Sequence, residues 1–144
     1  MRIFMIFIRG AERAAVEAHL DAHYLGRHDL WLWTNKDGTQ IDISIGSPPD
    51  SGMEKRIYRL HHSSLCLHVY IFGPRDTVEE ATAITMDLLS HFDGCAVDDH
   101  ITRAWTLEEI QEKRIVDCHR FLEGQVEYPG ISRGHYFVGS GPKN

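Results

Sequence analysis

The sequence has few cysteines, and their spacing suggests neither a zinc ribbon nor a disulfide framework. Three cysteines, Cys66, Cys95 and Cys118, lie far apart among 144 residues, without a Cys-x-x-Cys pair. An odd number of widely spaced cysteines is typical of reduced thiols rather than of a disulfide-stapled domain. We therefore interpret all three as small, buried apolar residues.

Long apolar runs are missing too. No stretch approaches the 18 residues that a transmembrane helix requires. The N-terminal run, residues 3–8, is shorter than the apolar part of a signal peptide, and Glu12 and Arg13 soon interrupt it. We therefore expect no membrane partner and a cytoplasmic location, and we interpret residues 2–8 as a buried first strand.

Positive charge is not in excess. The chain has 15 Lys and Arg against 21 Asp and Glu, so its formal net charge is −6. Nucleic-acid binding requires a concentrated face of Lys and Arg, which the scattered basic residues here do not predict. An acidic surface instead favours a basic protein partner.

Motifs for nucleophilic catalysis and for phosphate binding are absent from the sequence. There is no G-x-S-x-G elbow, no GxxxxGK[ST] loop and no GxGxxG after a predicted strand. We therefore expect no catalytic residue and no cofactor, and the chain is predicted not to be an enzyme.

The apolar pattern nevertheless predicts a well-defined fold. Strands are expected at residues 2–8, 29–34, 39–45, 64–72 and 95–97, and helices at residues 11–24, after an Asp76 cap, and at residues 107–123. Residues 46–56 hold two prolines and two glycines and are predicted to be a surface loop.

The resulting order is β-α-β-β-β-α-β-α, and three successive strands have no crossover helices between them. This order predicts an α+β fold, a two-layer sandwich of a mostly antiparallel sheet with helices packed on one face. Residues 1–123 are expected to form a single domain, followed by an irregular tail at 124–144.

Ten histidines make metal binding worth weighing. His19 and His23 are spaced i, i+4 on a predicted helix, which supplies half of a zinc site. Leu20 stands where an HExxH motif has its glutamate, and a third ligand would have to come from His28 or Asp21. We therefore expect an ordinary solvated helix face and no metal.

The densest polar cluster is Asp98-Asp99-His100. A metal-dependent hydrolase could use these carboxylates together with His100 or His68, but such a site needs carboxylates from separated segments. No second cluster of this kind is evident, so an acidic recognition surface is favoured.

Two further features involve tryptophan. Trp31 and Trp33 alternate with leucines and either anchor a partner or pack under a helix. Thr106-Leu-Glu-Glu109 has the spacing of a helix-capping box, and Trp105 before it is placed to pack on Ile110.

One segment resembles a known family. Phe92-Asp93-Gly94-x-Ala96-x-Asp98-Asp99, followed by residues 105–110 (WTLEEI), resembles the C-terminal signature of small bacterial immunity proteins, the cognate inhibitors of contact-delivered toxins. The resemblance implies a non-enzymatic protein that binds and neutralises a toxin, and it carries over no catalytic residue. The expected partner contacts are Asp98, Asp99, His100, Glu108, Glu109, Trp31 and Trp33.

A third alternative is a small-ligand-binding domain, because α+β sandwiches can bind metabolites between helices and sheet. The sequence leaves the oligomeric state open.

Overall fold

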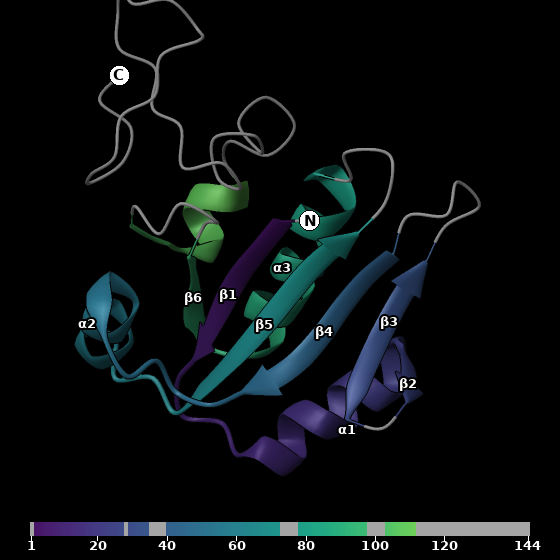
Figure 1. The fold of residues 1–144 in the computed structure, drawn as a ribbon, viewed down its shortest axis with the longest axis horizontal. Helices are drawn as coiled ribbons and strands as arrows, with labels where there is room; N and C mark the ends of the chain where they lie inside the picture. The colour runs from purple at the N-terminus through teal and green to yellow at the C-terminus, as the bar shows by residue number, and fades with distance from the viewer. Residues whose placement is uncertain (1, 28, 35–39, 73–77, 98–102, 112–144) are drawn as a thin grey trace, which may run out of the picture.

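The computed structural model describes residues 2–27, 29–34, 40–72, 78–97 and 103–111 (Figure 1). Its strands are β1 (Arg2–Ile8), β2 (Leu25–Arg27), β3 (Leu30–Thr34), β4 (Gln40–Gly46), β5 (Leu65–Phe72), β6 (Gly94–Val97) and β7 (Ala104–Trp105). Its helices are α1 (Arg13–His23), α2 (Gly52–Leu60) and α3 (Val78–His91), and residues 107–111 are also helical.

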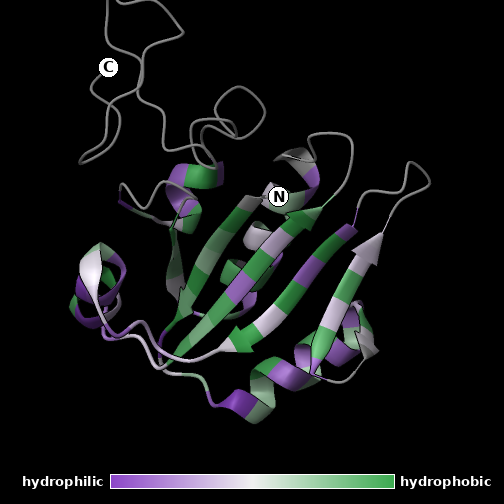
Figure 2. Cartoon of the chain, viewed as in Figure 1, coloured by the Kyte–Doolittle hydropathy of each residue, from purple (hydrophilic) through white to green (hydrophobic). Residues whose placement is uncertain are grey.

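The strands form a seven-stranded antiparallel sheet in the order β2-β3-β4-β5-β1-β6-β7. The apolar segment β1 lies between β5 and β6, and its side chains enter a buried cluster on each face of the sheet, whereas β4 and β5 alternate polar and apolar residues (Figure 2). Both edge strands are short, with three residues in β2 and two in β7. The α+β class and the mostly antiparallel sheet are therefore confirmed.

The larger core lies on one face of the sheet. Phe4, Ile6 and Ile8 of β1 share a buried cluster with Leu20 of α1 and Leu88 of α3. In Figure 1, α3 lies behind the sheet. Within the described residues, no helix is long and apolar enough to cross a membrane.

Helix α2 was not expected. Residues 46–56 were predicted to be a loop, but the helix begins at Gly52 within that range. Ile57 packs in a second buried cluster with Met5 and Phe7, on the face of β1 opposite the larger core. One helix therefore lies on the other side of the sheet from α1 and α3.

The end of the described chain follows the predicted capping pattern. The Glu109 amide donates to Thr106 Oγ1 at 3.2 Å, and the Thr106 amide donates to Glu109 Oε1 at 2.9 Å. Trp105 and Ile110 are buried in the same cluster, as the staple requires. The capping box is confirmed.

Strand β6 differs from its predicted place. The expected edge strand at residues 95–97 pairs with both β1 and β7, so β7 forms the edge instead. The Asp76 cap, Cys118 and the tail at 124–144 lie outside the described residues.

Candidate functional site

Of the two tryptophans predicted as partner contacts, Trp31 belongs to the core and Trp33 packs against it. Trp31 is 4% exposed, and its indole Nε1 donates to Asp21 Oδ1 at 2.8 Å. Trp33 is half-buried and packs against the same cluster. Packing under a helix, the alternative that the sequence allowed, therefore describes Trp31, because a buried ring cannot anchor a partner.

The acidic residues predicted as partner contacts have different environments. Glu108 is exposed, whereas Glu109 is half-buried and pairs with Arg103 as well as Thr106. Burial raises the pKa of Glu109, but the hydrogen bonds from Thr106 and Arg103 and the charge of Arg103 outweigh it, so the pKa falls below its ordinary value. Residues 98–100, Asp98-Asp99-His100, lie outside the described residues.

Glu109→Ala is expected to lower the free energy of unfolding by about 1 kcal/mol near neutral pH, because it removes the bonds to Thr106 and Arg103. Since folding lowers the Glu109 pKa, this stability is fully present above the ordinary value of 4.5 and is lost as the pH falls through the folded-state pKa. Urea unfolding of Glu109→Ala and of the unchanged protein between pH 7 and pH 2 tests this. A difference that stays constant, or grows on acidification, would contradict the expectation.

The described cysteines are unsuited to nucleophilic catalysis. Burial raises the pKa of Cys66 to about 12, and burial is also the largest influence that raises the pKa of Cys95 to about 12. His68 Nε2 lies 3.7 Å from Cys66 Sγ, but burial lowers the pKa of His68, so the ring supplies no cation to stabilise a thiolate. Cys66 and Cys95 are both free thiols, as predicted.

A cluster of polar side chains lies between α1 and α3. His19 Nε2 is 2.9 Å from Asp87 Oδ2, and the ring of His19 lies 4.3 Å from the rings of both His23 and His91. The Tyr24 hydroxyl donates to the same carboxylate oxygen of Asp87 at 3.0 Å. We call these five residues the histidine–aspartate cluster.

The carboxylate of Asp87 is the centre of this cluster. Burial alone would raise the pKa of Asp87, but the hydrogen bonds from His19 and Tyr24 and the charges of His19 and His91 lower it. Burial and the adjacent carboxylate raise the pKa of Tyr24 in turn, so Tyr24 remains a hydroxyl donor.

The prediction of a solvated face at His19 and His23 is wrong for His19, whose side chain is 8% exposed. Of the two third ligands considered, Asp21 is bonded to Trp31, and His28 is outside the described residues. The cluster is completed instead by Asp87 and His91, which repeat the i, i+4 spacing of His19 and His23 on another helix.

A second candidate site is the sheet face opposite the larger core. Tyr70 and Phe72 of β5 stack at 6.3 Å, and His68 contacts Tyr70 edge-on at 6.1 Å. The register places Tyr70 opposite Ile3 on one side and Asp42 on the other. Ile3 and Phe72 are each 37% exposed. We call Ile3, Asp42, His68, Tyr70 and Phe72 the aromatic face.

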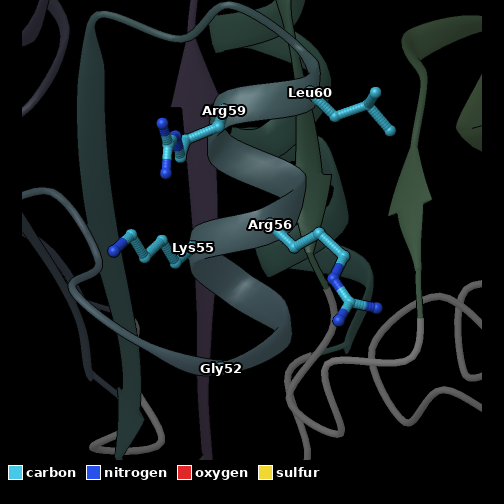
Figure 3. Close-up of a pocket in the computed structure, with 5 residues that line it drawn as sticks. All are labelled: Gly52, Lys55, Arg56, Arg59 and Leu60. Atoms are coloured by element: carbon cyan, nitrogen blue, oxygen red, sulfur yellow. The ribbon is translucent and has the colours of Figure 1, made fainter.

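An open pocket lies along α2. Figure 3 shows the side chains of Lys55 and Arg59 on one side of the helix and those of Arg56 and Leu60 on the other. The pocket is lined by Gly52, Lys55, Arg56, Arg59 and Leu60. Three of these five residues have cationic side chains, so the pocket suits anionic groups better than an apolar metabolite.

Comparisons with protein-family models, with curated proteins and with solved structures give no match for this chain.

Proposed function

We propose that this chain is a non-enzymatic immunity protein that binds and neutralises a cognate toxin in the bacterial cytoplasm. The proposal begins with the resemblance at residues 92–99 and 105–110. Within the described part, Gly94–Val97 forms β6, and Trp105 leads into the capped helix. These residues support a shared architecture, so the residues that contact a toxin are sought on an exposed surface.

The observation that carries the binding role is the aromatic face. Partly exposed Tyr70 and Phe72 lie in a row on a regular sheet, where their positions are fixed by backbone pairing. Aromatic side chains are enriched in protein interfaces and often supply most of the binding energy. The carboxylate of Asp42, beside Tyr70, adds an acidic group that suits a basic partner.

The test is co-expression with the product of the neighbouring gene. We expect the full chain to rescue growth and to co-purify with that product. Tyr70→Ala and Phe72→Ala are each expected to weaken the complex at least about tenfold, which corresponds to about 1.4 kcal/mol. Leu60→Ala on α2 is the matched control, because Leu60 is 71% exposed and lies outside the aromatic face.

The outcomes separate the function from the surface. If the chain neither rescues growth nor forms a complex, the immunity role is ruled out for that gene pair. A complex weakened by Leu60→Ala but not by Tyr70→Ala or Phe72→Ala would keep the function and place the contact on α2. Thermal unfolding of each variant shows whether a loss of binding is a loss of folding.

A further inference from the structure

The histidine–aspartate cluster brings together two matched pairs of potential ligands. His19 and His23 lie four residues apart on α1, and Asp87 and His91 lie four residues apart on α3. Ligand atoms of His19, Asp87 and His91 all lie within 4.8 Å of one another. Side chains at i and i+4 share a helix face, so each helix contributes two groups to the same space.

Two of the imidazoles are held in the form that binds metals. His23 Nδ1 bonds the His19 carbonyl at 2.9 Å, and His91 Nδ1 bonds the Asp87 carbonyl at 3.1 Å. A carbonyl oxygen can only accept, so each Nδ1 carries a proton, and the nitrogen that a metal could bind is Nε2. Histidines that ligate metals commonly donate their other nitrogen to a carbonyl in this way.

The spacing of the donors also suits a metal. Two ligands of tetrahedral zinc, at about 2.0–2.1 Å from the ion, lie about 3.4 Å apart. His19 Nε2 and Asp87 Oδ2 are already 2.9 Å apart, and a ring nitrogen of His91 lies within 4.8 Å of ligand atoms of both residues. Small side-chain rotations would therefore open a position for an ion between the groups.

The backbone adds to the attraction for a cation. His23 is the last residue of α1, and His91 is the last residue of α3. The carboxyl end of a helix carries a partial negative charge, which stabilises positive charge nearby. Two such ends and the Asp87 carboxylate converge on this cluster.

A simple structural clamp would not need all of these residues. The hydrogen bonds to Asp87 from His19 in α1 and from Tyr24, the residue after α1, already join α1 to α3. The hydrogen bonds of His23 and His91 stay within their own helices, yet both rings lie near His19. Two more imidazoles in this position are better explained as ligands.

We propose that His19, Asp87 and His91 bind a divalent transition-metal ion of the zinc class, with His23 as the fourth ligand. Imidazole nitrogens with a single carboxylate are a donor set that suits zinc, nickel and cobalt better than magnesium or calcium. Tyr24 orients the carboxylate by its hydrogen bond to Asp87. Four protein ligands would close the site, so the ion fastens α1 to α3.

The experiment is zinc binding by the full chain, purified without a histidine tag and stripped with a chelator. We expect calorimetry to give one zinc ion per chain and zinc to raise the melting temperature. His91→Ala is the first variant, because His91 is exposed and its loss should leave the fold intact. It and His23→Ala are each expected to weaken zinc binding at least about tenfold, and Tyr24→Phe about tenfold.

His61→Ala is the control, since His61 is a half-buried histidine outside the cluster, and its zinc affinity should equal that of the unchanged protein. Cobalt binding gives a second readout, because tetrahedral coordination produces a visible absorption band that His91→Ala should shift or weaken. No stoichiometric zinc, or zinc binding that His91→Ala and His23→Ala leave unchanged, would overturn the proposal.

Discussion

Gly94→Ala is expected to lower the free energy of unfolding by about 3 kcal/mol or more. A methyl group on Gly94 would overlap the carbonyl oxygen of Phe7 and lie 3.1 Å from Ile8 Cα. Both contacts are with the backbone of β1, which is buried on both faces and cannot yield as the end of a flexible side chain would. Overpacking of a core by one methyl typically costs about 1–3 kcal/mol, and an immovable neighbour places this site at the upper end.

Urea unfolding of Gly94→Ala beside Gly26→Ala measures this effect. Gly26 also lies in a strand, but the nearest atoms to a methyl group there would be Asp21 Oδ1 and Trp31 Nε1, each at 3.4 Å. Gly26→Ala should therefore stay within about 0.5 kcal/mol of the unchanged protein. Equal midpoints for the two variants would show that β6 does not approach β1 as described.

Trp105→Ala is expected to cost about 3–5 kcal/mol, the range for removing a buried aromatic side chain. Trp105 is 2% exposed and is the largest of the fully buried side chains in the described residues. The guanidinium of Arg103 also lies 4.4 Å from the ring centroid, a cation–π contact that the variant loses.

Chemical denaturation followed by far-ultraviolet circular dichroism gives the measurement. Trp105→Phe is the conservative partner and should lose substantially less, because it keeps an aromatic ring for the core and for Arg103. A loss below about 1 kcal/mol for Trp105→Ala would mean that the edge of the sheet contributes little to the core.

Both predictions concern the segment that resembles immunity proteins. Gly94 is required by the close approach of β6 to β1, and Trp105 by the core beneath β7. Glu109 is occupied by bonds to Thr106 and Arg103. In the described part of this segment, Gly94, Trp105 and Glu109 therefore have architectural roles.

The sequence predicts the central strands well, because each has a strong local pattern. Residues 2–8 are continuously apolar and form β1 in the interior of the sheet. Alternation at residues 39–45 matches β4, whose Ile41 and Ile43 are buried while Asp42 and Ser44 are half-buried. The two-residue period leaves little freedom in which side faces the core.

Helix α2 and the histidine–aspartate cluster were missed for different reasons. Prolines at 48 and 49 favour a loop, although Met53, Ile57 and Leu60 have helical spacing, and Ile57 is the one of the three that is buried. The cluster depends on helix packing that brings residues 68 positions apart within hydrogen-bond distance. A local pattern contains no information on such a distance, and the repeated i, i+4 spacing becomes meaningful once the helices face each other.

The short edge strands affect how the protein behaves at high concentration. Exposed strand edges act as templates for pairing with other chains and are a common origin of aggregation. In the described sheet, β2 offers three residues and β7 offers two, so an incoming strand would gain few backbone hydrogen bonds at either end. A chain built in this way can reach a high concentration with little tendency to polymerise through its own sheet.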